Sequence, residues 1–593
     1  MTRGRTLQGP VSETVEQEDE ENSGSKLPNL FEISLTVTVP DESDVKPLVA
    51  ACKSEDIGLQ EIARAIERSL SASEMIERCK ISGPGSVNVT LSEQWRGKCI
   101  QEMLIKGIEI WAPKLPVRKA VVDCSRKLSE EMHVNHFIST IIGDTLARVL
   151  EFSNVEVLRR THVMDWGPEF GMLIEFLFET FPGWEVANYQ GIGDLGVLYE
   201  TSQHRFDSDT DFKRRARKAV VRLQDGEEKY RYAWELICDF SRREYERVYK
   251  RLGVQLEEKG ESFYNRYIPG TLVLLREKGL IEESNGACVI FIEGKNTPLT
   301  VVNRDGGFDS AHNLAALWYQ LNEEKVDWIV CVTDVGQQEH FEMLFTAAKR
   351  AGWLPSDDKK YPKASHVGFH LELGEYCKRV QTRSTKAVWT DDLLDKAKQR
   401  SRAALVARGL ISCENWTNKE LEQTAEALGS GAVKYASLEN NLLTDYLSDC
   451  DRLFIDEDNP AVDLLSEHAR ICSIIKKSGK DIEELKKTGK LELNHPAECR
   501  LGLHLLQFAE IVEDACTKLS PSVLCEYLDK ISYDFFIFDL CCQVVGSAEE
   551  ISRLLLCEAT AIVMGKCLHL LGLTPIKRNL RLIPPPSMTR KGF

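Results

Sequence analysis

The stretch EMHVNHFISTIIGDTLARVLEF, residues 131–152, decides the fold. Apolar residues recur through it at the spacing of an amphipathic helix: Ile141, Ile142, Leu146, Val149 and Leu150. A β-branched run, KAVVDCS at 119–125, precedes the stretch, and a second run, VEVLRRTHV at 155–163, follows it. Strand, helix and strand at this spacing predict a βαβ unit with two parallel strands.

The same alternation recurs further along the chain. The runs GACVIFI at 286–292 and DWIVCVTD at 327–334 flank a helical segment, NLAALWYQL. We therefore expect one doubly wound parallel sheet of the Rossmann type. Residues 170–285 lie between the two halves and are mostly helical in pattern, so they are predicted to be an insertion into this domain.

The rest of the chain divides by composition. Residues 1–27 are polar and acidic and predict a disordered tail. Residues 28–115 contain two strand patterns, FEISLTVTV and VNVTLS, around the helical pattern DIGLQEIARAIERSL, which predict a small α+β domain. The Rossmann-like domain is expected at 116–395. Helical segments fill 396–593 up to a short proline-rich tail, which predicts a helical bundle.

Composition excludes several classes of protein. The chain of 593 residues is 43% hydrophobic and 28% charged, which is typical of globular domains. No apolar run approaches the ~18 residues of a membrane span, so no membrane association is expected. The acidic N-terminus lacks an apolar signal segment, and eighteen cysteines occur without a Cys-x-x-Cys pair. These features predict a cytoplasmic protein with reduced thiols; the alternative is a mitochondrial or chloroplast protein whose presequence is missing.

The net charge of -17 disfavours a general nucleic-acid binder, but phosphate binding depends on local patches. Most charge runs are solvated helix faces, and both interpretations stay open here. Four basic clusters occur: Lys213, Arg214, Arg215, Arg217 and Lys218; Lys378 and Arg379; Lys476 and Lys477; Lys577, Arg578 and Arg581.

The pair His133 and His136 has three interpretations. Two histidines three residues apart on a helix can bind zinc, but no further ligand stands at a recognisable spacing. They can be ordinary packed histidines. They also follow a strand and open a helix, where free N–H groups and the helix dipole attract phosphate. In that setting two imidazoles can hold a triphosphate. Asn135, between them, occupies a position where a close approach to phosphate favours glycine.

Longer segments carry a resemblance to a known family. Besides residues 131–152, these are VTDVGQQEHFEMLFTAAKRAGW, SHVGFHLELG and EHARICSII. From about residue 30 to 573 the chain resembles class I arginyl-tRNA synthetases of the plant type. The resemblance implies a Rossmann-type catalytic domain, an N-terminal domain that contacts the tRNA and a helical anticodon-binding bundle. It implies an arginine–tRNA ligase that uses ATP with Mg²⁺ and L-arginine to charge tRNA(Arg). It also implies a monomer without a tightly bound cofactor or a protein-bound metal.

The resemblance also implies site residues, each matched to a motif of the family. The residues expected to act on the phosphates during catalysis are His133, His136 and Lys378. Those expected to bind ATP are His133, His136, Gly143, Asp144, Lys378, Thr382 and Arg383. Those expected to contact arginine are Ser125, Lys127, His136, Asp309, Asn313 and Gln337.

Several motif positions depart from the family. Asn135 replaces the signature glycine, and Ser125, Arg126 and Lys127 stand where the family has Ser-Pro-Asn. Asn313 stands in place of an Asp that recognises the guanidinium, with Asp309 near the position of a Tyr. These changes predict weaker ATP binding and still weaker arginine binding. They leave two hypotheses, an active arginine–tRNA ligase or a catalytically impaired relative that binds tRNA or a protein partner.

Overall fold

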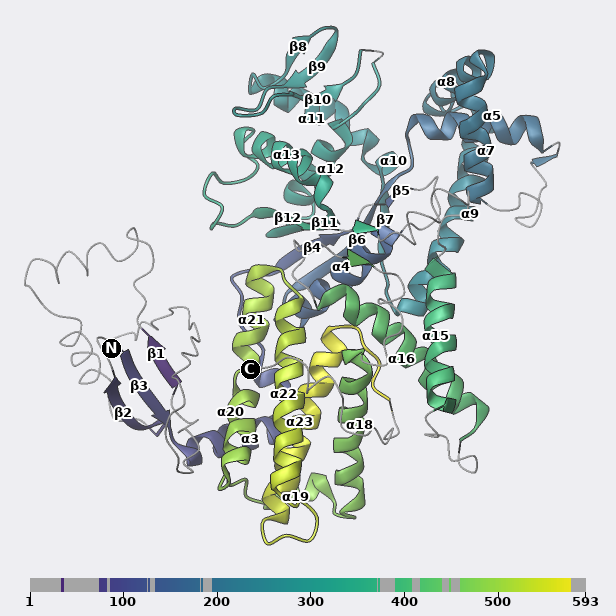
Figure 1. Cartoon of the computed structure of the whole chain (residues 1–593). Coiled ribbons are helices and arrows are strands. Elements are labelled where there is room, and N and C mark those ends of the chain that lie inside the picture. Colours follow the sequence, from purple (N-terminus) through teal and green to yellow (C-terminus); the bar gives the residue numbers. More distant parts are fainter. Residues whose placement is uncertain are drawn as a thin grey trace, which may run out of the picture. The chain divides into compact units, whose positions relative to one another are not determined.

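The computed structural model describes residues 33–36, 74–82, 86–124, 126–127, 134–181, 183–184, 195–304, 306–370, 372–373, 390–407, 416–439, 447–448 and 459–576. Contacts group the chain into two compact units (Figure 1). The first combines Met1–Trp111, Ile471–Phe508 and Lys530–Val563. The second combines Ala112–Arg470, Ala509–Asp529 and Met564–Phe593, and it contains the predicted site.

A parallel sheet forms the centre of the second unit. Its strands are β4 (Lys119–Asp123), β5 (Arg126–Lys127), β6 (Glu156–Met164), β7 (Glu257–Gly260), β11 (Trp328–Asp334) and β12 (Lys363–Phe369). The order is β12-β11-β4-β6-β5, and β7 pairs with β6. All pairs are parallel, and Val121 of β4 lies in register between Leu158 and Ile329. β4 and β11 are almost wholly buried, as expected for strands covered on both faces.

The βαβ prediction is confirmed by helix α4 (Val134–Phe152), which connects β4 to β6. On the other side of β4, β11 is followed by the short turn η4 (Val335–Gln337), helix α13 (Gln338–Arg350) and β12. Helix α12 (Ala311–Asn322) precedes β11. The connection from β4 runs to β6 and the connection from β11 runs the opposite way to β12, which is the doubly wound arrangement predicted from the sequence.

One predicted strand belongs elsewhere. Residues 286–292 were expected in the parallel sheet, but β9 (Ala287–Ile290) pairs antiparallel with β8 (Glu282–Ser284) and β10 (Leu299–Val302) in a separate sheet. Asn285 and Gly286 both have positive φ, 52° and 81°, and join β8 to β9 by a two-residue turn. Asn-Gly is a strong hairpin signal, so the correct pairing was legible in the sequence.

Four helices form most of the insertion: α5 (Pro168–Thr180), α7 (Leu195–Ser208), α8 (Thr210–Gln224) and α9 (Glu228–Leu252). Phe170, Leu173, Phe212 and Ala219 are fully buried in their common core. The chain then returns to the sheet in β7, and the extent of the insertion, about 170–285, stays a prediction. Helix α10 (Glu261–Tyr264), the turn η3 (Asn265–Tyr267) and helix α11 (Ile268–Glu277) follow, and their buried residues share a core cluster with those of α12.

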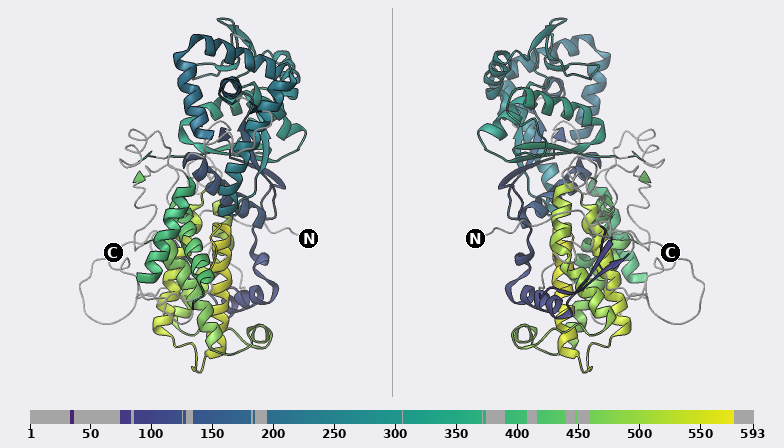
Figure 2. Two further views of the ribbon diagram at one scale, coloured as in Figure 1. Left: turned by 90° about the vertical axis from the view of Figure 1, so that its right-hand side faces the viewer. Right: turned by 90° about the vertical axis from the view of Figure 1, so that its left-hand side faces the viewer.

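The C-terminal segments are helical, as predicted. They are α15 (Thr390–Ala407), α16 (Asn418–Leu438), α18 (Pro460–Lys477), α19 (Ile482–Thr488), α20 (Pro496–Leu506), α21 (Phe508–Lys518), α22 (Ser522–Cys541) and α23 (Glu550–Leu570). Helices α20 and α21 are separated by a single residue, Gln507. Within the first unit the helix segments run side by side (Figures 1 and 2). Helices α15 and α16 belong to the same compact unit as the parallel sheet. The predicted domain boundary at 396 stays a prediction.

The N-terminal part of the first unit contains β1 (Ile33–Thr36), β2 (Ile76–Ser82) and β3 (Ser86–Leu91), in the antiparallel order β1-β3-β2. Helix α3 (Glu93–Lys106) and the turn η1 (Ile108–Trp111) follow. The predicted helix at 56–70 and the predicted tail lie outside the described residues. A two-stranded pair, β13 (Glu372–Leu373) and β14 (Leu447–Ser448), completes the strands of the described part. None of the helices described combines the length and the apolar character needed to span a bilayer.

Candidate active site

The candidate site lies at the carboxyl ends of β4, β6 and β11. In a doubly wound sheet, ligands bind outside these strand ends, where the strand order reverses. Here the reversal is between β4 and β11, because the connections from these two strands run to opposite sides. The first turn of α4 follows β4 and the turn η4 follows β11, so these two segments lie beside the point of reversal.

Asn135 and Asp334 face each other across this point. Nδ2 of Asn135, in the first turn of α4, donates a 3.1 Å hydrogen bond to Oδ2 of Asp334 at the end of β11. The other carboxylate oxygen of Asp334 accepts a 2.6 Å hydrogen bond from the N–H of Gly336. Asp334 thus fixes η4 and also holds the Asn135 side chain. The residue that replaces the signature glycine is therefore engaged with the sheet.

His136 is buried and packed against α9. Its Nε2 lies 2.8 Å from the hydroxyl of Tyr249, and its ring meets the ring of Tyr245 edge-on at 5.4 Å. Thr140, one turn along α4, places its hydroxyl 3.4 Å from the same nitrogen. These contacts are those of a satisfied core histidine at a helix N-terminus. His133 lies outside the described residues, and so do Ser125, Lys378, Thr382 and Arg383.

Gly143 and Asp144 lie near the middle of α4, where both contact other residues of the chain. A Cβ at Gly143 would stand 2.3 Å from Sγ of Cys124, so this glycine allows the close approach of α4 to β4. The buried carboxylate of Asp144 binds the guanidinium of Arg148, with Nε at 2.7 Å, and that of Arg159. Both residues thus have scaffold contacts, and their ATP contact stays a prediction.

The structure brings two predicted arginine contacts to a third residue. Nδ2 of Asn313, in the first turn of α12, donates a 3.1 Å hydrogen bond to Nε2 of His340 on α13. Desolvation lowers the pKa of His340, and the nearby carboxylate of Asp309 acts in the opposite direction. The exposed residue Gln337 ends η4, three residues before His340. Asp309, Asn313 and His340 therefore form one polar group. His340 belongs to the same sequence motif as Gln337.

A second group of carboxylates lies beside the first. Burial, together with the carboxylates of Asp165, Glu169 and Asp309, raises the pKa of Glu261 to about 8. Burial also raises the pKa of Asp165, although Ser262 donates hydrogen bonds from its N–H at 2.9 Å and its hydroxyl at 2.5 Å. Burial and neighbouring carboxylates both disfavour the charged form of such groups. The group is therefore a cluster of partly buried carboxyl groups whose charged forms are disfavoured.

Glu261 and His340 were missed at the level of sequence. Glu261 follows β7, a four-residue strand without apolar alternation, so nothing local marks it as the end of a sheet strand. His340 stands three residues after Gln337 in GQQEH. This short spacing was the one sequence feature that could have placed His340 near the predicted arginine contacts. Lys127 lies in β5, where its backbone pairs with Met164, directly before Asp165. The predicted Lys127 contact with arginine stays a prediction, and the strand that leads to Asp165 is its partner β6.

Comparison with known proteins agrees with this geometry. The family model "tRNA synthetases class I (R), catalytic domain" matches residues 99–450, and "DALR anticodon binding domain" matches residues 464–578. Two proteins of Arabidopsis thaliana are 56% identical to the chain. They are a chloroplastic/mitochondrial arginine–tRNA ligase, with 95% of this chain and 92% of that protein covered, and a cytoplasmic one, with 94% and 98% covered.

The fold is shared with solved structures as well. The arginyl-tRNA synthetase of Plasmodium falciparum superposes with a TM-score of 0.75 at 28% identity, covering 88% of this chain and 89% of that one. The enzyme from Thermus thermophilus has a TM-score of 0.69 at 19% identity, over 90% and 93%, and supports the fold alone. With its catalytic-domain match, its parallel sheet and these relatives, the chain belongs to the class I arginyl-tRNA synthetase family.

Proposed function

We propose that this chain is an arginine–tRNA ligase. The carboxylate of L-arginine attacks the α-phosphorus of ATP, a new carboxyl oxygen–phosphorus bond forms, and pyrophosphate leaves. A ribose hydroxyl at the end of tRNA(Arg) then attacks the carbonyl carbon of the adenylate, and AMP leaves. The relatives that are 56% identical over 95% and 94% of the chain carry this activity in their names.

The observation that carries the proposal at the level of the site is the acidic group around Glu261. A guanidinium is permanently charged and takes carboxylate partners in a bidentate geometry. Glu261, Asp165 and Asp309 supply carboxylates whose mutual repulsion a guanidinium relieves, with Asp309 near His340. Asn313 and Gln337 then border the substrate from α12 and η4. Asp309 thus replaces part of the guanidinium recognition that the substitution at Asn313 removes.

The nucleotide is expected at the N-terminus of α4, with ATP entering as its magnesium complex. Free N–H groups of the first turn and the helix dipole favour the phosphates. His136 holds this turn through Tyr249, so we assign it a positioning role. The roles of His133, Lys378, Thr382 and Arg383 toward the phosphates, and those of Ser125 and Lys127 toward arginine, are carried by the resemblance.

The remaining properties are also proposals. We expect a monomer. We expect the cytoplasm as its compartment, which is the label of one of the two relatives that are 56% identical. The match to a chloroplastic/mitochondrial relative makes an organelle the alternative.

The test is direct charging. Purified full-length protein, tRNA(Arg), ATP with Mg²⁺ and labelled arginine should yield acid-precipitable arginyl-tRNA, and labelled lysine should not. A Glu261→Gln variant should lose most of the activity at low arginine concentration. Absence of charging by the wild-type protein at micromolar enzyme, with arginine and tRNA still bound, would favour the impaired relative instead.

A further inference from the structure

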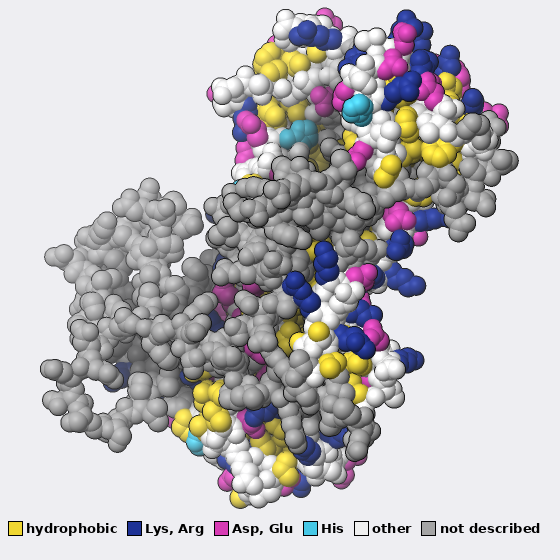
Figure 3. Space-filling model, turned by 45° about the vertical axis from the view of Figure 1, so that its right-hand side comes forward, with side chains coloured by type: hydrophobic (Ala, Val, Ile, Leu, Met, Phe, Trp, Pro, Cys, Tyr) yellow, Lys and Arg dark blue, Asp and Glu magenta, His cyan; other side chains and the backbone are white. Residues whose placement is uncertain are grey.

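Helix α8 has two chemically different sides. Phe212, Ala216, Ala219 and Leu223 are buried in the core of the insertion. The opposite side carries Lys213, Arg214, Arg217 and Lys218, which repeat with the helix turn. We call these four residues the basic face of α8. Space-filling shows Lys and Arg side chains gathered over this helical part of the second unit (Figure 3).

The other two arginines of α8 are already used by the fold. Arg215 binds the carboxylates of Glu175 and Glu179, which lie on α5. Arg222 donates a 2.7 Å hydrogen bond to the hydroxyl of Tyr230 on α9. These contacts hold α8 in the insertion. A structural role therefore accounts for Arg215 and Arg222, and it does not account for the basic face.

Contacts within the protein use only part of the basic face. Lys213 lies over the ring of Phe206, 4.8 Å from its centroid. Arg214 has a 2.9 Å ion pair with Asp211, in which both side chains are 70% exposed, so the pair is weak. Arg217 and Lys218 are exposed and have no partner among the residues that the structure describes. Two to four cations are thus available to a ligand.

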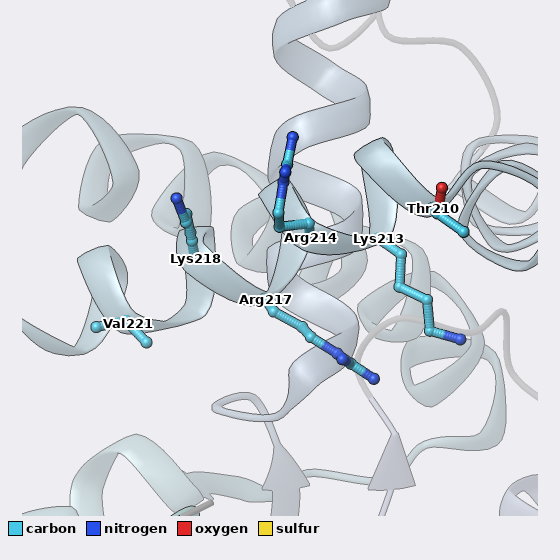
Figure 4. Close-up of a pocket in the computed structure, with 6 residues that line it drawn as sticks. All are labelled: Thr210, Lys213, Arg214, Arg217, Lys218 and Val221. Carbon is cyan, nitrogen blue, oxygen red and sulfur yellow. The ribbon is translucent and has the colours of Figure 1, made fainter.

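The arrangement of these side chains forms two rows. In Figure 4, Arg214 and Lys218 point to one side of the helix, and Lys213 and Arg217 point to the other. Members of a row are one helical turn apart, about 5.4 Å. A hollow of about 460 Å³ follows this face, with Thr210 and Val221 at its ends. Cations repeating at this interval along an extended strip fit a linear polyanion better than a single anion.

The basic face of α8 is positively charged, whereas the chain as a whole is negatively charged. The protein carries a formal charge of -17, yet the strip from Thr210 to Val221 has four outward cations and one exposed carboxylate, Asp211. A membrane surface would need an apolar strip beside the cations, and Val221 is the one large apolar side chain among the six that border the hollow. Phosphodiester backbone satisfies the charge and the spacing without any apolar contact.

We propose that the basic face of α8 binds the sugar–phosphate backbone of the tRNA substrate. The contact increases tRNA affinity and takes no part in the chemical steps. This inference rests on the proposed function for the identity of the nucleic acid, and it assigns that function a specific surface. It leaves arginine and ATP binding to the sheet.

The experiment compares two matched double variants of the full chain. Arg217→Ala with Lys218→Ala removes two cations from the face. Arg276→Ala with Lys278→Ala removes the same two residue types from exposed positions at the end of α11. The dissociation constant for tRNA(Arg) is measured by filter binding from 50 to 200 mM salt, and arginine binding by calorimetry. Alanine is a strong helix former, so both variants should fold; circular dichroism and thermal melts check this.

The face variant should bind tRNA roughly tenfold more weakly, and the slope of log affinity against log salt should fall in magnitude by about two. Arginine affinity should not change, and the α11 variant should match the wild type. An unchanged tRNA affinity and salt slope in the face variant, or an equal loss of affinity in both variants, would overturn the inference. The proposed function would still stand in that case if the wild-type protein charges tRNA(Arg). Loss of binding to anionic phospholipid vesicles, with tRNA binding intact, would overturn it in favour of a membrane surface.

Discussion

The side chain of Asn135 is hydrogen bonded to Asp334, at 3.1 Å, across the point where the sheet reverses its strand order. One residue belongs to the helix that follows β4, and the other ends β11. The contact joins the segment expected to bind phosphate to the turn that carries Gln337. The Asn135 side chain therefore ties the first turn of α4 to the end of β11.

Replacement Asn135→Gly should lower the KM for ATP. It removes the side-chain amide beside the expected phosphate position and one exposed hydrogen bond, which contributes about 1 kcal/mol, so we expect a several-fold change. The measurement is the KM for ATP in the charging assay, with Asn135→Ala as the control. A gain with glycine alone would show that space for the nucleotide matters, and a gain with both would identify the tie to Asp334. An unchanged or higher KM with glycine would show that Asn135 does not obstruct the site.

Replacement Glu261→Gln should weaken arginine binding by about 10- to 100-fold, since a charged hydrogen bond contributes about 1.5–3 kcal/mol. The pKa of Glu261 is raised to about 8, so the wild-type carboxyl must lose a proton to bind a guanidinium. Arginine affinity should therefore rise from pH 6 to pH 9 in the wild type and stay flat in the variant. Calorimetry in buffers of different ionisation heat would measure the proton release. Glu283→Gln, on the exposed strand β8, is the control and should behave as the wild type.

The same replacement should improve stability in mildly alkaline solution. The folded protein holds the Glu261 proton up to a pKa of about 8, whereas an unfolded chain releases it near 4.5. The folded state thus binds more protons between these values, and stability falls as pH rises through that window. Glutamine resembles the protonated acid and removes this slope. Thermal melts at pH 5 and pH 8 should therefore show a smaller pH-dependent loss in the variant, and equal losses in both proteins would contradict the prediction.

Replacement Asn313→Asp should strengthen arginine binding by roughly tenfold, because it adds a carboxylate next to His340. The nearby carboxylate of Asp309 opposes the gain through like-charge repulsion. Calorimetric titration with arginine at pH 7.5 is the measurement. Asn303→Asp, at an exposed position before α12, adds the same charge outside the group and should leave the affinity unchanged. Weaker binding in Asn313→Asp would show that the acidic group is already saturated with negative charge.

Replacement Gly143→Ala should destabilise the second unit by about 1–3 kcal/mol, because the added methyl group would overlap Sγ of Cys124. Cys124 is buried and its thiol donates a hydrogen bond to the Ser139 carbonyl, so it has little room to move. The double variant Cys124→Ala with Gly143→Ala should lose less stability than the sum of the single changes. Urea unfolding of the four proteins provides this cycle, and strict additivity would show that the two residues do not compete for space.

The local elements followed from the sequence because their signals are local. Periodic apolar residues defined α4 and the C-terminal helices, and β-branched runs defined β4, β6 and β11. The assignment failed where a strand had two possible partners. β9 is apolar enough for the parallel sheet, but the Asn285–Gly286 turn pairs it with β8. A turn of two residues closes a hairpin at a low entropic cost, and that local closure determined the sheet.

Sequence by itself determined the βαβ core, the helical C-terminal part and the motif positions that carry the family resemblance. Only the tertiary structure decided which side chains meet. Glu261 lies about a hundred residues after Asp165, and the structure brings the two together because β7 pairs with β6. Asn135 reaches Asp334 because β4 and β11 are neighbours in the sheet. Strand pairing between distant segments sets these contacts, and residue spacing along the chain does not encode it.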